Sequence, residues 1–360
     1  MNHEGRLDRL AARMGEEGLD ALVLTHLVNV RYACGYVGSN GVVLLTPDRR
    51  ILFTDFRYLI VSRERTRGVE VLEAGRDLLE RVSEIVRESA PGWRVGFEAD
   101  HTSVSRCEVL GAKAPDVEWV PTRGLVEGLR MVKEAEEIDL MARASQIADL
   151  AFAACRDGIF AGRTEREVAW ELEGIMRRAG AERASFDIIV ASGPRGAMPH
   201  AVPGDERIPT DTLVTIDMGA RVEGYASDCT RTFATGTPPD ALVEAYDVCL
   251  AAQQEALAAV RAGITGGDLD AVARNRIAAA GFGEAFRHGL GHGVGLDLHE
   301  PPYAREGITD VIRAGMTVTI EPGIYLEGVG GVRIEDLAVV TEDGARVLTG
   351  FTKERLRVDC

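Results

Sequence analysis

Four carboxylates lie in segments whose other residues are typical of buried β-strands. Asp217 stands in LVTIDMG, Asp228 in YASDCTRTF, Glu321 in VTIEPG and Glu335 in GVRIEDL. Acidic residues are depleted in strands, and burying a carboxylate costs several kcal/mol unless it is paired or bound to a metal ion. These four positions therefore indicate a functional site.

The spacing of the four acids predicts two hairpins. A hairpin that closes about Val222 and Glu223 places the two aspartates directly opposite each other, and one that closes about Gly328 does the same for the two glutamates. Cross-strand partners have Cβ atoms about 4.5–5.5 Å apart. Four uncompensated carboxylates at such distances could not all stay ionised, and two divalent cations would remove the repulsion.

A segment rich in histidine and glycine lies between the two predicted hairpins. It reads HGLGHGVGLDLHEPP from residue 288 and contains His288, His292 and His299. Its glycines let the backbone pass close to a ligand. It is not a phosphate loop, because it has neither a Walker lysine nor the strand-to-helix context of G-x-G-x-x-G. A histidine alone is usually a surface or packed residue, but beside four strand carboxylates this cluster indicates an imidazole ligand.

Four carboxylates with one imidazole form an oxygen-rich, hard donor set. Such a set suits Mn²⁺, Co²⁺ or Fe²⁺ and, less exclusively, Zn²⁺. The chain has no H-E-x-x-H motif, so a thermolysin-like single zinc is unsupported. Two ions about 3.5–4 Å apart would bridge a water molecule, lower its pKa and polarise a carbonyl, which favours hydrolysis as the chemistry.

The elements that would position these residues repeat along the chain. A helical stripe over 138–155 and a T-x-x-E capping box at Thr164 predict two helices before the first hairpin. Two more are predicted over 239–260 and 268–281, before the second. VTIDMG at 214–219 and VTIEPG at 318–323 then share four of six residues at an offset of 104. We interpret this as a duplication that gives two related αα-β-hairpin halves.

The first part of the chain has a different pattern. Apolar runs at 21–24, 41–45, 51–53 and 95–97 predict short buried strands, separated by amphipathic stretches such as 76–89. No dense set of metal ligands occurs here. The stretch PTRGLVEG at 121–128 is the candidate linker, so we predict domains at 1–125 and 126–360, which fits a chain of 360 residues.

Composition excludes several partners. The chain has 41 basic and 57 acidic residues and a formal net charge of −16, which disfavours nucleic acid and anionic membrane surfaces. It lacks an apolar stretch of about 18 residues, and its start has no apolar signal region, so we expect no membrane association and a cytoplasmic protein. The six cysteines, which form no C-x-x-C pair, are predicted to be reduced thiols.

Together these motifs resemble a known superfamily. The order D-x₁₀-D, H, E-x₁₃-E, with HGLGHGVGLDLHEPP, IEPGIY and RIED, resembles the pita-bread metallopeptidases, and within them the Xaa-Pro branch of aminopeptidase P and prolidase. NVRYACGYVGSNGVVLLTPDRRILFTDFRY resembles the creatinase/prolidase N-terminal domain. The resemblance covers essentially the whole chain. It implies an α+β fold: a C-terminal pita-bread domain, with pseudo-twofold αα-β-hairpin halves around a curved antiparallel sheet, and a smaller α/β N-terminal domain.

The resemblance also implies a ligand set. It makes Asp217 and Asp228 ligands of one divalent ion, and Asp228, His292, Glu321 and Glu335 ligands of a second. Mn²⁺ is the expected metal, with Co²⁺, Zn²⁺ and Fe²⁺ as alternatives. A hydroxide that bridges the two ions would attack the scissile carbonyl, with Glu321 as the proton shuttle.

Four more residues match positions with a role in this branch. His200 matches a histidine that contacts substrate or a metal-bound oxygen, and Arg333 matches an arginine beside the last glutamate. His288 and His299 match histidines that orient the substrate and stabilise the tetrahedral intermediate. Tyr303 stands where some prolidases carry a basic residue that holds the carboxylate of a dipeptide, which favours longer peptides here.

The expected function is that of an Xaa-Pro aminopeptidase, a dinuclear exopeptidase that releases the N-terminal residue before proline. Short proline-containing peptides would be its substrates, and a homodimer its assembly. The alternatives are a dipeptide-only prolidase, an aminopeptidase indifferent to proline, and, from a different class, a non-catalytic peptide-binding protein or a metal-free creatinase-like hydrolase. The last two predict the loss of ligands, whereas all five candidate ligands are present.

Overall fold

The computed structural model describes residues 1–89, 92–160 and 162–358. The chain divides into two compact units, Met1–Arg130 and Met131–Cys360. Pro121, in the expected linker, belongs to the last strand of the first unit and pairs with Phe97. None of the described helices is long and apolar enough to cross a membrane.

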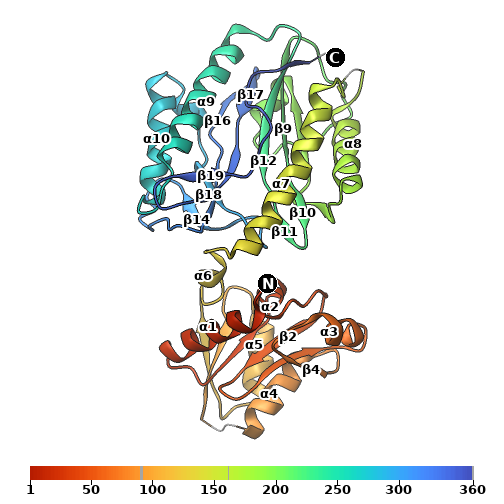
Figure 1. Ribbon diagram of the computed structural model, residues 1–360, viewed down its shortest axis with the longest axis vertical. Helices are drawn as coiled ribbons and strands as arrows, with labels where there is room; N and C mark the ends of the chain where they lie inside the picture. The colour runs from red at the N-terminus through yellow and green to blue at the C-terminus, as the bar shows by residue number, and fades with distance from the viewer. Residues whose placement is uncertain (90–91, 161, 359–360) are drawn as a thin grey trace. The chain divides into compact units, whose positions relative to one another are not determined.

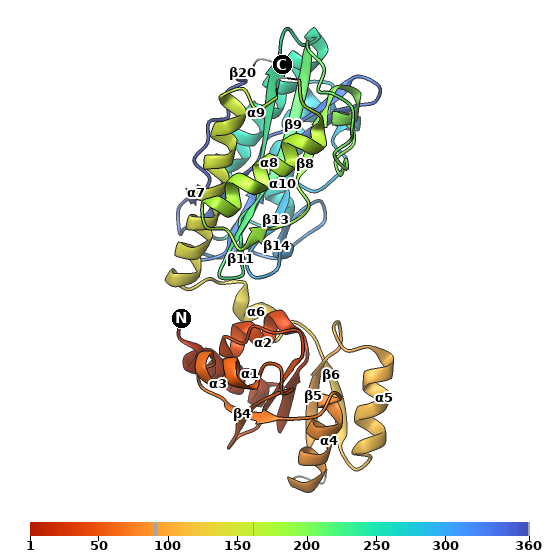
Figure 2. The ribbon, with the colours of Figure 1, turned by 90° about the vertical axis from the view of Figure 1, so that its right-hand side faces the viewer.

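The N-terminal unit is a mixed sheet with helices on both sides (Figure 2). Its strand order is β4-β3-β2-β1-β5-β6, in which β1 is antiparallel to β2 and parallel to β5. The predicted strands are β1, β2, β3 and β5. The two edge strands β4 and β6 are half exposed and lack the apolar runs that marked the others. The elements are α1 (His3–Glu16), β1 (Ala21–Leu24), α2 (Leu27–Cys34), β2 (Gly41–Leu45), β3 (Arg50–Thr54), α3 (Leu59–Arg65), β4 (Glu70–Glu73), α4 (Leu78–Ser89), β5 (Arg94–Glu98), α5 (Val104–Lys113), β6 (Glu118–Thr122) and α6 (Glu127–Arg130).

The first half of the C-terminal unit begins with the two predicted helices. The α8 helix carries the capping box as expected, because the Thr164 side chain accepts from the Glu167 backbone and the Glu167 side chain accepts from the Thr164 backbone. The strands that follow are largely buried. The elements are α7 (Ala135–Arg156), α8 (Glu165–Arg178), β7 (Arg183–Ala184), β8 (Ile189–Ser192), the 3₁₀ turn η1 (Gly193–Ala197), β9 (Thr212–Met218), β10 (Ala220–Val222), β11 (Tyr225–Ala226) and β12 (Cys229–Thr235).

The second half repeats this order, with α9 and α10 on the side of the strands opposite α7 and α8 (Figure 1). This arrangement confirms the predicted pita-bread architecture with its two αα-β-hairpin halves. The elements are α9 (Asp240–Ala259), α10 (Gly266–Ala279), η2 (Gly283–Ala285), β13 (Gly291–Gly293), β14 (Glu300–Ala304), β15 (Thr317–Ile320), β16 (Gly323–Leu326), β17 (Gly330–Arg333), β18 (Asp336–Val340), β19 (Ala345–Val347) and β20 (Arg357–Val358).

The register of the second hairpin is the predicted one. Ile320 pairs with Asp336 and Gly323 pairs with Arg333, so the register between these pairs places Glu321 opposite Glu335. The two acids lie where the ladder is interrupted, between β15 and β16 on one strand and between β17 and β18 on the other. The backbones of Glu321 and Glu335 therefore do not take part in the strand pairing that holds the flanking residues.

The predicted register of the first hairpin is wrong by two residues. Asp217 pairs with Thr230 and not with Asp228. The cause is the turn, since Val222 pairs with Tyr225 and the loop is Glu223 and Gly224, one residue later than expected. Because side chains alternate between the two faces of a sheet, a shift by two residues leaves both aspartates on the same face.

Strand β12 joins the two halves. The backbone N–H of Glu335 donates to the carbonyl of Thr230 at 3.1 Å, so the acid of the second hairpin is fixed directly to the first. Behind this junction the buried Arg231 donates to the carboxylate of Asp336 at 2.7 Å. Its guanidinium also donates to the carbonyl oxygens of Phe351 and Glu335.

We expect the Arg231→Met substitution to lower the free energy of unfolding by about 3–5 kcal/mol, because it leaves the buried carboxylate of Asp336 with fewer partners. Urea denaturation measures this loss. Arg81→Met, which breaks an exposed ion pair with Glu84, is the matched control and should cost less than about 1 kcal/mol. Equal losses in the two variants would contradict the role assigned to Arg231.

The described cysteines are free thiols, as predicted. Cys34, Cys155, Cys229 and Cys249 are buried and Cys107 is partly exposed. Cys360 lies outside the described residues.

Candidate metal centre

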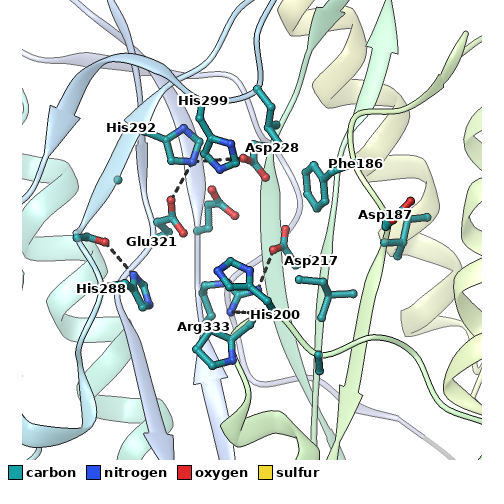
Figure 3. Close-up of a pocket in the computed structure, with 18 of the residues that line it drawn as sticks. Phe186, Asp187, His200, Asp217, Asp228, His288, His292, His299, Glu321 and Arg333 are labelled. Carbon is teal, nitrogen blue, oxygen red and sulfur yellow. Dashed lines mark hydrogen bonds and ion pairs between the residues drawn. The ribbon is translucent and has the colours of Figure 1, made fainter. Parts of the chain in front are cut away.

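A pocket of about 520 Å³ opens in the C-terminal unit, between the two hairpins and the histidine-rich segment (Figure 3). Every site residue named from the sequence lines it. These residues are Asp217, Asp228, His292, Glu321, Glu335, His200, His288, His299 and Arg333.

The five candidate ligands come from five strand ends or short strands. Asp217 lies in β9 and Asp228 directly before β12, while Glu321 follows β15 and Glu335 precedes β18. His292 is the middle residue of β13. The glycines on either side of it have no room for a side chain, because a Cβ at Gly291 would meet the backbone of β15 and one at Gly293 would meet the backbone of β14. The two halves of the fold thus contribute to one cluster.

The donor atoms of this cluster are close together. One carboxylate oxygen from each of Asp217, Asp228 and Glu335 lies within 4.8 Å of the others. The Nε2 atom of His292 lies 3.3 Å from Oε1 of Glu321 and 3.7 Å from Oδ2 of Asp228. These five side chains therefore face a common centre, and Figure 3 shows Asp217, Asp228, His292 and Glu321 around the same space.

Hydrogen bonds orient the donors from behind. The Nδ1 atom of His292 donates to the carbonyl of Gly293 at 3.0 Å, which fixes the ring with Nε2 toward the carboxylates. The hydroxyl of Thr319 donates to Glu321 at 2.9 Å, and that of Thr230 donates to Glu335 at 2.8 Å. Such support is typical of metal ligands.

Two of the carboxylates have orphaned oxygens. Oδ1 of Asp217 and Oε1 of Glu335 are buried and have no hydrogen-bond partner among the described residues. A buried carboxylate oxygen without a partner is costly, and a divalent cation would satisfy it. The donor set therefore fits the binding of two divalent cations.

The pKa values of the acids in the protein alone also indicate that cations bind here. Burial raises the pKa of Asp228 well above its ordinary value, and the charge of Asp217 raises it further. Burial and the charge of Asp228 do the same to the pKa of Glu335. Without cations these acids are driven toward protonation, which is the repulsion expected from the sequence.

His292 and Glu321 stabilise each other as an ion pair. Burial lowers the pKa of His292, but the hydrogen bond and charge of Glu321 outweigh burial and raise it to about 9. Burial raises the pKa of Glu321, but His292 outweighs it and lowers that pKa below its ordinary value. Glu321 is therefore ionised even without bound cations.

A chain of polar contacts links Asp217 to His288. Arg333 donates to Oδ2 of Asp217 at 2.8 Å and to the hydroxyl of Tyr325 at 2.9 Å, and that hydroxyl lies 2.9 Å from Nε2 of His288. Burial lowers the pKa of His288 and favours a neutral ring. Tyr325 was not among the predicted site residues, although it stands four residues after Glu321, on the same hairpin.

His200 and His299 lie on the open side of the pocket. Both are exposed, and His200 is in the loop that follows η1. The His299 ring centre is 4.3 Å from that of His292. A group bound at the carboxylate cluster would therefore meet imidazoles from two separate loops.

Acidification should stabilise the metal-free protein. Since Asp228 and Glu335 have raised pKa values in the folded state, that state binds more protons than the unfolded chain, and stability is lost as the pH rises through the raised values. We expect the unfolding midpoint of chelator-treated protein to rise between pH 8 and pH 6 by about 2–4 °C for each kcal/mol recovered. A variant with Asp228→Asn and Glu335→Gln should show a smaller rise, because only the part that comes from the raised pKa of His292 remains. A midpoint that falls over this range in the unsubstituted protein would contradict the prediction.

Family models match both units of the chain. Metallopeptidase family M24 matches residues 139–342, and the Creatinase/Prolidase N-terminal domain matches residues 6–132.

Individual proteins match the chain over nearly its full length. It is 37% identical to an Xaa-Pro dipeptidase of Pyrococcus furiosus over 98% of this chain and 99% of that protein. The structure of an Xaa-Pro dipeptidase from Bacillus anthracis superposes with a TM-score of 0.95 at 41% identity, covering 99% of this chain and 100% of that one. An X-Pro aminopeptidase from Thermotoga maritima superposes with a TM-score of 0.91 at 35% identity, covering 98% and 99%. The chain therefore belongs to metallopeptidase family M24, in its Xaa-Pro peptidase branch, and is a metallo-exopeptidase.

Proposed function

We propose that this enzyme hydrolyses the bond between an N-terminal residue and a following proline, and that dipeptides are its preferred substrates. The sequence favoured longer peptides because Tyr303 replaces a basic residue. The observation that now carries the preference for dipeptides is a cation on the pocket wall, Arg305. The Xaa-Pro dipeptidases among the relatives support the same reading.

Arg305 is placed to meet a carboxylate. Of the two arginines that line the pocket in the described structure, Arg333 is paired with Asp217, whereas Arg305 forms no ion pair with a described carboxylate. Its guanidinium carbon lies 5.4 Å from the centre of the Tyr303 ring, which holds it over that side chain. The C-terminal carboxylate of a dipeptide lies one residue from the scissile bond, so a cation near the metal centre selects for it.

The residues of the cluster have distinct roles in this proposal. Asp217, Asp228, His292, Glu321 and Glu335 would hold two divalent ions, which when bound polarise the scissile carbonyl and activate a water molecule. Glu321 accepts the proton of the attacking water and delivers it to the proline nitrogen that leaves.

The remaining site residues handle the substrate. The exposed His299 and His200 donate to the carbonyl oxygen as its negative charge develops. His288 lines the same pocket and helps to orient the substrate, with Nδ1 donating to the carbonyl of Gly289 and Nε2 held by the hydroxyl of Tyr325. Arg333 fixes Asp217 through their ion pair.

The pocket has an apolar wall that suits a proline ring. Phe186, Ile188, Val202 and Leu298 line it together with the carboxylate cluster, and Figure 3 shows Phe186 on the same side as the two aspartates. Proline lacks an N–H and fixes its own φ, so a site for it needs apolar contact more than a hydrogen-bond acceptor.

The second candidate is an Xaa-Pro aminopeptidase. At position 303 the pocket wall carries a partly buried tyrosine in place of a basic residue. This position therefore supplies no second cation, beside Arg305, to hold the carboxylate of a dipeptide. The likeness to the Thermotoga maritima X-Pro aminopeptidase supports this alternative.

Kinetics on matched peptides test the proposal. We expect kcat/KM to be higher for Ala-Pro than for Ala-Pro-Ala, and Arg305→Gln to reduce kcat/KM for Ala-Pro by at least about tenfold while sparing Ala-Pro-amide, because only the acid carries the anchored charge. Arg287→Gln, an exposed arginine outside the pocket lining, is the control. Preferred cleavage of Ala-Pro-Ala would favour the aminopeptidase, comparable cleavage of Ala-Ala-Ala would remove the proline requirement, and no cleavage would favour a peptide-binding protein.

Three further properties belong to the same proposal. The oxygen-rich donor set supports Mn²⁺ as the native metal. The N-terminal unit exposes Val37, Phe56 and Ile60, whose exposed fractions of 50%, 74% and 75% support a homodimer. Free cysteines support a cytoplasmic protein. Metal analysis of protein purified without added metal, and sedimentation, check the first two.

A further inference from the structure

The N-terminal unit places polar residues at a switch in strand order. The chain builds β2, β3 and β4 on one side of β1 and then returns to build β5 and β6 on the other, so the order reverses between β1 and β5. These two strands are parallel, and their carboxyl ends lie at the same edge. In open α/β sheets a ligand binds at such a point, outside the carboxyl ends of the strands.

Two histidines and a glutamate meet at this edge. His26 follows β1, His101 follows β5 and Glu127 begins α6. The two imidazole rings are stacked, with centres 3.7 Å apart and planes inclined by 5°. One donor atom from each of the three residues lies within 4.8 Å of the others, and Nε2 of His101 is 3.7 Å from Oε1 of Glu127.

A buried network holds two of these residues from behind. Oε2 of Glu98 accepts from the backbone N–H of His26 at 2.7 Å, and Oε1 of Glu98 accepts from the side-chain amide of Asn29 at 2.6 Å. The same amide donates to Oε1 of Glu127 at 2.5 Å. Arg130 in turn donates to the amide oxygen of Asn29 at 2.7 Å. Such support is what fixes the ligands of a metal site.

The cluster is open to solvent on the His101 side. A cavity of about 10 Å³, the size of a single water molecule, adjoins it and is bounded by Glu98, His101 and Glu127, whereas His26 is not among the described residues that line this cavity. One third of the His101 side chain (33%) is exposed, so an ion can enter from solvent and this ring can turn out of the stack. With bonds of about 2.0–2.1 Å, neighbouring donors around a tetrahedral ion are roughly 3.4 Å apart, and the ion lies in the plane of each imidazole ring. Two parallel stacked rings do not meet this condition, so the His101 ring must turn out of the stack when an ion binds.

We propose that His26, His101 and Glu127 form a binding site for a divalent transition metal ion, with Zn²⁺ as the ion that two imidazoles and one carboxylate suit best. The site is independent of the carboxylate cluster, because all three ligands belong to the N-terminal unit. A fourth position remains for water. Since nothing in the pocket of the C-terminal unit contributes to it, the ion stabilises the N-terminal unit and takes no part in hydrolysis.

Zinc content of the full-length protein tests this proposal. Wild-type protein, His101→Gln, His26→Gln and the control Glu118→Gln are stripped with a chelator, dialysed against micromolar Zn²⁺ and analysed for metal per chain. Both histidine variants should bind one equivalent less than wild type, whereas Glu118→Gln, which changes an exposed carboxylate of β6, should match wild type. The carboxylate cluster is the same in all four proteins, so its ions cancel in the comparison.

Two further readouts complete the test. Zn²⁺ should raise the unfolding midpoint of wild type more than that of His101→Gln, and kcat/KM after loading with the activating metal should be unchanged in His101→Gln. Equal zinc content in wild type and both variants would overturn the proposal. So would a loss of stability in His101→Gln at acidic pH without any change in zinc, because it would show that the cluster is only a histidine–glutamate ion pair.

Discussion

Glu321→Gln is expected to reduce kcat/KM by at least about 10³-fold while the protein stays folded. The amide keeps the shape of the side chain but cannot accept a proton, and general acid–base catalysis alone contributes about 10²–10⁴-fold. The substitution also removes the charge that pairs with His292 at 3.3 Å. Steady-state kinetics with Ala-Pro, at saturating activating metal, measure the loss.

Glu327→Gln is the matched control for this prediction. Glu327 is an exposed glutamate on the turn of the same hairpin, and its substitution should leave kcat/KM unchanged. Metal content measured in parallel separates the two effects expected at Glu321, since a loss of turnover with full metal content isolates the proton transfer. Activity within tenfold of wild type would exclude Glu321 as the proton shuttle.

Removal of bound metal is expected to abolish turnover, and the addition of one of Mn²⁺, Co²⁺, Zn²⁺ or Fe²⁺ should restore it. The buried acids repel one another without cations, and the orphaned oxygens of Asp217 and Glu335 have no other described partner. Elemental analysis should find nearly two ions per chain in the reactivated enzyme, beyond any ion held by the N-terminal unit.

The Glu335→Gln substitution gives a second test of the metal centre. Glu335 belongs to the second hairpin and is fixed to the first. Its backbone N–H donates to the carbonyl of Thr230, and its carboxylate accepts from the hydroxyl of the same residue. Its substitution should lower the metal content and the activity together, with circular dichroism unchanged. Full activity in protein stripped of metal would overturn the assignment of the cluster as the catalytic centre.

The acids of the cluster could be found from the sequence because the free-energy cost of burying a carboxylate in an apolar strand can be recognised there. A carboxylate within an apolar strand needs a reason whatever the surrounding fold, and the spacing about Gly328 gave the register of the second hairpin. The register of the first hairpin could not be predicted in this way. Its turn consists of Glu223 and Gly224, with φ of 46° and 80°, and a glutamate does not indicate a positive φ as an asparagine or a glycine does.

Other contacts depend on strand order, which spacing does not reveal. His26 and His101 are far apart in sequence and meet only because β1 pairs with β5. Arg305 comes to the pocket by following β14, two residues beyond the position where a basic residue was sought. Tyr325 contacts His288 across two separate segments of the second half. None of these contacts has a local signal. The sequence therefore showed the acids of the centre and, through the resemblance, its histidines and Arg333, but not Tyr325 or Arg305.

The junction at Thr230 has a consequence for biosynthesis. Each half of the duplicated unit supplies only part of the ligand set, and Glu321 follows Asp217 by 104 residues. A nascent chain that has made only the first hairpin has two acids but lacks their partners. The complete set arises only when the second hairpin has been synthesised and docked on β12. Cation capture therefore follows the folding of the second hairpin, and metal occupancy reports that both halves have docked.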